Sequence, residues 1–91
     1  MYAALIKLTI DRAQAPAAAA AFTNQILPKI TSAEGFRASH WLDPTDGEGL
    51  GLVLFDTEQQ ARRLAPQDFD WSAPGVSIRG VDIRRVAVSV P

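Results

Sequence analysis

His40 is the only histidine in this chain of 91 residues, and histidine is the side chain that most readily exchanges protons near neutral pH. The residues around it predict a strand over residues 36–42. In a pocket, His40 would act as a general acid or base, or would anchor a phenol or carbonyl by a hydrogen bond. On an exposed strand face it would bond only to a neighbour or to water. The residues alone leave both interpretations open.

Tyr2 and Asn24 are the other candidate catalytic residues. Tyr2 shares a face of an expected strand with Ile6 and Leu8, where a buried hydroxyl would need a hydrogen-bond partner and would be a candidate proton donor. Asn24 lies in the middle of an expected helix, beside its apolar stripe. Facing a cavity, it would donate to a ligand carbonyl or stabilise an enolate; facing water, it would be an ordinary surface residue.

Three aromatic residues, Phe22, Trp41 and Trp71, are candidates for substrate binding. Trp41 follows His40 directly, so in a regular strand only one of the two can face a pocket, and packing in a dimer interface is the expected role of Trp41. Trp71 lies in an irregular stretch, where it would line the mouth of a pocket or close the edge of the domain. Large aromatic side chains beside a cleft suit a flat aromatic ligand, but they also suit a core.

The ligand types for a metal ion are scarce. The chain has no cysteine and one histidine, which disfavours a preformed zinc or non-haem iron site within one chain. Asp43, Asp46 and Glu48 lack the ligand spacing of a helix-loop-helix calcium site, and we interpret them as a turn. We therefore predict neither a metal nor a cofactor.

The charge pattern excludes several kinds of partner. Nine basic residues face ten acidic ones, and apart from Arg62-Arg63 and Arg84-Arg85 they are scattered, so no basic stripe could follow a run of phosphates. The apolar segment 1–10 contains Lys7 and is too short to span a membrane. We expect a cytoplasmic protein without nucleic-acid or membrane partners.

Apolar periodicity predicts a strand over residues 2–10 and a helix over residues 15–33. Positions four apart form the buried stripe of that helix: Ala18, Phe22, Ile26 and Ile30. Pro16 fits the first helical turn, whereas Pro28 should kink or loosen the helix. Gly35 should follow the helix in the left-handed conformation.

A hairpin should come next, with strands over residues 36–42 and 50–55 and a loop over residues 43–49 that contains Asp-Pro and Asp-Gly. Asp56 or Thr57 should then cap a short second helix, with Gln59 or Gln60 completing a capping box. That helix should end before Pro66 and carry three residues inward: Ala61, Leu64 and Ala65.

The last predicted strand runs from Val76 to Val90. Its apolar alternation slips twice, at Gly80 and at Arg84-Arg85, and such slips indicate β-bulges.

The predicted order is β-α-β-β-α-β, which is the ferredoxin-like arrangement of an α+β protein. We expect one domain over residues 1–91, with an antiparallel four-stranded sheet in the order 4-1-3-2 and both helices on one face. The other face would keep apolar side chains with no element of the chain left to cover it. Because such a face is unfavourable in water, we predict a homodimer in which a second copy covers it.

With these elements in place, the chain resembles the dimeric α/β-barrel superfamily, and within it the antibiotic biosynthesis monooxygenase-like proteins. Four features carry the resemblance: the kinked helix through Leu27-Pro28, the strand start at Gly35-Phe36, the hairpin returning through Leu50–Phe55, and the helix start at Asp56-Thr57-Glu58. The resemblance implies that two sheets form a barrel and that each subunit has a pocket between its own sheet and helices.

The resemblance also implies a small-molecule enzyme, similar to cofactor-independent monooxygenases that act on aromatic or polyketide-like substrates. The alternative is a dimer of the same fold that binds a small apolar ligand or serves as an accessory without catalysis. The haem-degrading branch uses an Asn in the first strand and a His with a Trp. Here the first strand has no Asn and the second helix has neither His nor Trp, so this branch is not favoured.

Overall fold

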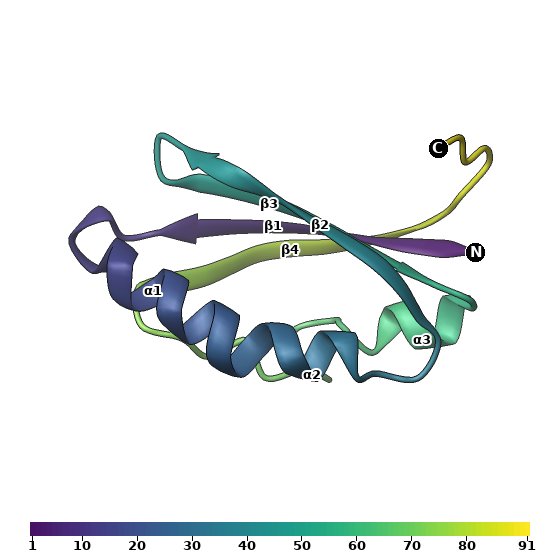
Figure 1. Ribbon diagram of the computed structural model, residues 1–91, viewed down its shortest axis with the longest axis horizontal. Coiled ribbons are helices and arrows are strands. Elements are labelled where there is room, and N and C mark those ends of the chain that lie inside the picture. Colours follow the sequence, from purple (N-terminus) through teal and green to yellow (C-terminus); the bar gives the residue numbers. More distant parts are fainter.

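The computed structural model describes all residues 1–91 as one layer of strands covered on one side by helices (Figure 1). The four strands are β1 (Tyr2–Ile10), β2 (Phe36–Thr45), β3 (Glu48–Phe55) and β4 (Val76–Arg85). All neighbouring pairs are antiparallel, and the order across the sheet is β2-β3-β1-β4. The predicted α+β, ferredoxin-like arrangement and its strand order are therefore confirmed.

The first helix is continuous in space but changes its hydrogen-bonding pattern on the way. A 3-10 turn (Arg12–Gln14) leads into α1 (Ala15–Ala21), a π-helical turn (Phe22–Ile26) and α2 (Leu27–Thr31). The Leu27 N–H donates to the Phe22 carbonyl, five residues back. Pro28 has no N–H for the carbonyl four residues before it, so a wider turn at this place is the expected accommodation. The predicted loosening of the helix is confirmed, and the helix ends two residues earlier than predicted.

Two caps fix the ends of the helices. Gly35 has φ +79°, the left-handed conformation predicted for it. In α3 (Glu58–Arg62), the Thr57 hydroxyl accepts from the Gln60 N–H at 3.2 Å, and the Gln60 side chain accepts from the Thr57 N–H at 3.1 Å. The capping box predicted for this helix is thus confirmed, with Thr57 as the capping residue.

The hairpin is tighter than predicted. Asp46 and Gly47 both have positive φ, +52° and +79°, and they form a two-residue turn between Thr45 and Glu48, which pair with each other. The predicted seven-residue loop 43–49 is wrong because the Asp-Gly pair alone makes the turn. Pro44 lies in β2, where its missing N–H is tolerated because β2 is an edge strand with an irregular register there.

The last strand is shorter than predicted. Gly80 pairs with Lys7 and Ile78 pairs with Leu8, which leaves Arg79 unpaired in a bulge and confirms the first predicted slip. The strand ends at Arg85, so its predicted extension to Val90 is wrong. Val88 and Val90 are each 78% exposed, because no neighbouring strand is there to pair with this segment.

The core lies between the helices and one face of the sheet. It contains ten buried residues: Ala4, Ile6, Leu8, Ile26, Ile30, Val53, Phe55, Ala61, Leu64 and Trp71. On the other face, which we call the open face, the strands present large apolar side chains to solvent. Leu42 is 61% exposed, Leu50 42% and Leu52 37%.

Candidate functional site

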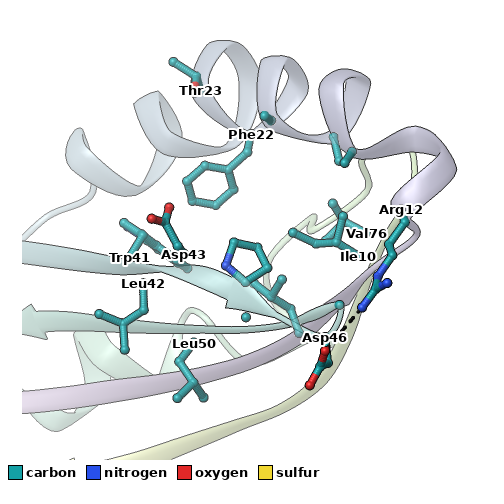
Figure 2. A pocket seen from close by; sticks show the side chains of 17 residues that line it. Ile10, Arg12, Phe22, Thr23, Trp41, Leu42, Asp43, Asp46, Leu50 and Val76 are labelled. Carbon is teal, nitrogen blue, oxygen red and sulfur yellow. Dashed lines mark hydrogen bonds and ion pairs between the residues drawn. The ribbon is translucent and has the colours of Figure 1, made fainter.

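A cavity of about 600 Å³ lies between the first helix and the turn end of the β2-β3 hairpin. Figure 2 shows Phe22 reaching down from the helix toward β2, with Ile10 and Val76 across from it. The lining is mainly apolar, with 10 hydrophobic residues among 17. Its size and apolar character are those of a small-molecule site.

Small residues line both sides of the cavity. The helix contributes Ala15, Ala18 and Ala19, and the hairpin contributes Gly47 and Gly49. The alanines have too little side-chain volume to fill the space between helix and sheet. The Leu8 side chain covers Gly49, where a Cβ would lie 2.8 Å from it. Further along the helix, Ile26 and Ile30 are almost fully buried and close the same gap.

Trp41 forms the inner wall of the cavity. Its six-membered ring lies directly over Gly51, where any Cβ would overlap it. The Phe22 ring meets it edge-to-face, with centroids 4.6 Å apart and planes at 68°, a favourable arrangement for two aromatic rings. The Trp41 Nε1 is buried and has no hydrogen-bond partner, which is unusual for a buried donor.

The placement of Trp41 corrects the expectation that it packs in a dimer interface. It pairs with Gly51 in the sheet, on the face that the helices cover. His40 pairs with Leu52 on the open face and is exposed, so within one chain it does not line the cavity. A bulge between Phe36 and Ala38 also turns Phe36 toward the core, whereas in a regular strand Phe36 would share the face of His40.

The other predicted site residues are dispersed. Phe22 lines the cavity beside Trp41. Trp71 is buried next to Trp41, with ring centroids 6.4 Å apart, but Trp71 does not line the cavity. The Trp71 Nε1 donates to the Leu64 carbonyl at 2.8 Å. Tyr2 packs against the core opposite Phe55. Asn24 is exposed.

Polar groups that were not predicted as site residues gather at the mouth of the cavity. Arg12 pairs with Asp46 at 3.4 Å, with both side chains largely exposed, so the pair is weak. Asp43 lies beside Trp41 on the same side of β2 (Figure 2). Residues two apart in a strand lie on the same face, so the position of Asp43 two residues after Trp41 could have indicated from the sequence that both face the cavity.

The donor chemistry of this cavity does not suit a metal or a haem iron. None of its 17 lining residues is His, Cys, Met or Tyr, the side chains that serve as axial ligands of haem. No group of three or more His, Cys, Asp or Glu residues is placed to hold a metal ion.

Comparison with solved structures finds the same fold. A crystal structure of an arginine-to-serine mutant of MhuD, with two manganese protoporphyrin IX molecules bound per active site, superposes with a TM-score of 0.67 over 100% of this chain and 99% of that chain. This chain therefore has the fold of that protein, which is the fold expected from the resemblance to the antibiotic biosynthesis monooxygenase-like proteins. The sequences are 13% identical, so the likeness concerns the fold alone.

Sequence comparisons add nothing to this likeness. No protein-family model matches the chain, and no curated protein matches it. No helix combines the length and apolar character needed to cross a membrane.

Proposed function

We propose that this chain binds a flat, apolar, aromatic small molecule in the cavity between the first helix and the hairpin. The volume of about 600 Å³ lies within the range of drug-sized ligand sites. Phe22 and Trp41 offer aromatic surfaces, and the alanines of the helix leave room for a thin, rigid ring system.

The single observation that carries the proposal is the Trp41 indole. Its buried N–H has no acceptor, and a buried donor without a partner costs about 1–3 kcal/mol. A ligand with a carbonyl oxygen would supply the acceptor once Phe22, whose ring packs against Trp41, turns aside. The expected ligand is therefore an aromatic ketone, quinone or phenolate rather than a plain hydrocarbon.

Tryptophan fluorescence tests this proposal. In a Trp71→Phe variant, Trp41 is the only tryptophan, so titration with anthraquinone should quench its emission in a saturable way. Anthracene has the same ring shape without the carbonyls, and it should bind at least tenfold more weakly. Failure of both probes to quench Trp41 would contradict the proposed binding of an aromatic ligand in the cavity. Equal binding of both probes would show that the indole N–H does not donate a hydrogen bond to the ligand.

Catalysis is a second candidate, favoured by the fold and by a carboxylate at the cavity. In cofactor-independent oxygenation the deprotonated substrate itself reduces oxygen, so the protein must supply a base, a dry pocket and a hydrogen bond to the developing anion. Asp43 stands next to Trp41 at the mouth and is the proposed base. His40, Tyr2 and Asn24, predicted from the sequence for such roles, do not line the cavity.

Oxygen consumption tests this second function. With an anthrone as substrate, one O₂ should be consumed per anthraquinone and water formed, and Asp43→Asn should lower the rate at least tenfold while binding of anthraquinone persists. His40→Ala is the matched control and should leave the rate unchanged. A tenfold lower rate in His40→Ala with an unchanged rate in Asp43→Asn would show that His40, and not Asp43, is the base.

A porphyrin is the ligand named for the MhuD structure, and it is not the ligand proposed for this chain, because the cavity offers no axial donor. Titration with haem should give no sharpened Soret band. A Soret band that saturates at a fixed stoichiometry would contradict this.

We also propose that the chain is a homodimer in which the open faces of two sheets meet. Leu42, Leu50 and Leu52 make this face too apolar to be stable in water. Sedimentation equilibrium should give twice the monomer mass at micromolar concentration, whereas a monomer at millimolar concentration would refute the dimer.

A further inference from the structure

The cavity between the first helix and the hairpin has three charged residues in its lining, and one of them has no partner. Arg12 and Asp46 pair with each other at 3.4 Å. Asp43 takes part in no ion pair and no side-chain hydrogen bond of the chain. Lys7 and Arg79 border a second hollow beside the hairpin together with Asp43, but neither pairs with it. The mouth of the cavity therefore carries one negative charge without a counter-ion.

A bulge in β2 sets the position of this carboxylate. Asp43 and Pro44 together oppose the single residue Gly49 of β3. Such a bulge interrupts the regular strand pairing and re-aims a side chain, and bulges are common next to functional sites. Figure 2 shows the Asp43 carboxylate turned toward the helix, on the cavity side of the hairpin. It is thus available to a molecule that enters the cavity.

The cavity consequently has a hydrogen-bond donor at its inner wall and an acceptor at its mouth. The donor is the buried Trp41 N–H, which has no partner, and the acceptor is Asp43. The Cα atoms of these two residues are two strand positions apart, roughly 7 Å. Apolar side chains such as Phe22, Ile10 and Val76 line the cavity besides these two polar groups. A ligand that satisfies both ends is a fused ring system with an acceptor at one end and a donor at the other.

We propose that the ligand of this cavity is an aromatic ketone or quinone that carries a protonated amine, with its carbonyl at Trp41 and its ammonium group at Asp43. This inference rests on the aromatic-ligand binding proposed above and adds the chemical class and the orientation of the ligand. It concerns binding and requires no catalysis. Asp43 is then the residue that determines specificity among aromatic ketones.

The charge at the mouth favours an amine over the other polar substituents. An ammonium group forms a charge-assisted hydrogen bond with a carboxylate, which is stronger than a bond between neutral groups. A hydroxyl group would also donate to Asp43, but it would leave the negative charge unbalanced. A ligand carboxylate would meet a like charge at Asp43, and the one cation in the lining, Arg12, is already paired with Asp46.

Three anthraquinones that differ in one substituent test the preference: 2-(aminomethyl)anthraquinone, 2-(hydroxymethyl)anthraquinone and anthraquinone-2-carboxylate. Quenching of Trp41 in the Trp71→Phe variant gives the Kd of each. At low ionic strength the amine should bind about threefold more tightly than the alcohol, the size expected for a largely exposed ion pair. The carboxylate should bind more weakly than the alcohol by a similar factor. Added salt should reduce both differences, because it screens exposed charges.

Two substitutions assign the preference to one residue. Asp43→Asn removes the charge with little change in shape, so the amine and the alcohol should then bind equally well. Asp68→Asn is the matched control, because it changes the net charge by the same amount at a residue that does not line the cavity. In that variant the amine should keep its advantage over the alcohol.

A fourth probe tests the orientation. The amine 2-(aminomethyl)anthracene has the same rings without the carbonyls, so it can reach Asp43 but offers no acceptor to Trp41. It should bind at least tenfold more weakly than 2-(aminomethyl)anthraquinone. Equal affinity of these two amines would show that one ligand does not engage both groups, and would overturn the proposed orientation.

The outcomes separate this inference from the binding function on which it rests. Equal Kd values for amine and alcohol in the presence of Asp43, or an advantage of the amine that survives Asp43→Asn, would overturn the inference while neutral anthraquinone still binds. Tightest binding of the carboxylate would also overturn it and would assign the contact to Arg12. If no anthraquinone quenches Trp41, both the inference and the proposed binding function are wrong.

Discussion

The two faces of this sheet are made by alternate residues of the same strands, and they differ in what covers them. On the face toward the helices, Ile6, Val53 and Phe55 are at most 1% exposed. On the open face, Leu50 and Leu52, which alternate with Gly51 and Val53 in the same strand, are 42% and 37% exposed. One face stabilises the fold of a single chain, and the other carries a surface of similar composition that the chain leaves uncovered. Apolar character alone therefore does not identify a core.

The packing of the helix-covered face also differs between its two ends. At the α2 end, Ile26 and Ile30 fill the space against the sheet. At the α1 end, the side chains of the helix are alanines, and the cavity remains between them and the hairpin. Packing at the first end stabilises the fold, while the second end keeps a site open for a ligand.

The largest expected effect comes from a pair of variants at adjacent residues of β1, one on each face of the sheet. Ile6→Ala should lower the free energy of unfolding by about 2–5 kcal/mol, because Ile6 is fully buried in the core. Leu5→Ala removes a side chain of the same size from the open face. Its cost should be less than half as large, and it should vary with protein concentration, as expected for a residue that a second copy covers.

Urea unfolding at two protein concentrations measures both variants. The Ile6→Ala loss should be the same at both concentrations relative to wild type. Equal, concentration-independent losses in the two variants would show that the open face is not used for association.

The fold was predictable because its signals are local. Period-2 apolar strands, the left-handed Gly35 and the capping box at Thr57 and Gln60 each depend on a few neighbouring residues. The side on which His40 and Trp41 lie was not predictable in the same way. It depends on the bulge after Phe36, on the pairing of Trp41 with Gly51 and on the missing Cβ that lets the ring lie there. These facts are set by the register between strands, which a single strand does not reveal.

The cavity escaped prediction for a similar reason. It results from small residues of the helix, such as Ala19, placed over the hairpin turn at Gly47. Each of them is unremarkable alone, since alanine favours helices and glycine is common near turns. The gap appears only when the helix is placed over the hairpin.

An intermediate effect is expected where the core meets the cavity. Gly51→Ala would place a methyl group inside the Trp41 ring, so the indole must move, and such overpacking costs about 1–3 kcal/mol. The displaced indole should also change its fluorescence and lose the quinone binding proposed above. Gly80→Ala is the matched control, because its Cβ meets nothing within 4 Å, and in the monomer it should leave both stability and fluorescence nearly unchanged. Unaltered Trp41 emission in Gly51→Ala would mean that the indole does not rest on this strand.

The smallest expected effect concerns two exposed carboxylates. The pKa of Asp82 lies below its ordinary value chiefly because the Arg84 side chain donates a hydrogen bond to it. The pKa of Asp70 is lowered chiefly by hydrogen bonds from Ser72. In both cases the folded state holds its proton less tightly than the unfolded chain. The stability each carboxylate contributes is therefore fully present above its unfolded pKa of about 4, and it is lost as the pH falls through the lower, folded value.

These two carboxylates distinguish the open face from the rest of the surface. Asp82→Asn and Asp70→Asn should each flatten the loss of stability below about pH 4 by a small amount, measured as the urea midpoint against pH. For Asp70 this change should not depend on protein concentration. For Asp82 it should depend on protein concentration, because Asp82 lies on the open face that the proposed second copy covers. An Asp82 effect as independent of concentration as that of Asp70 would place Asp82 outside the contact between copies, since only residues in that contact couple their protonation to association.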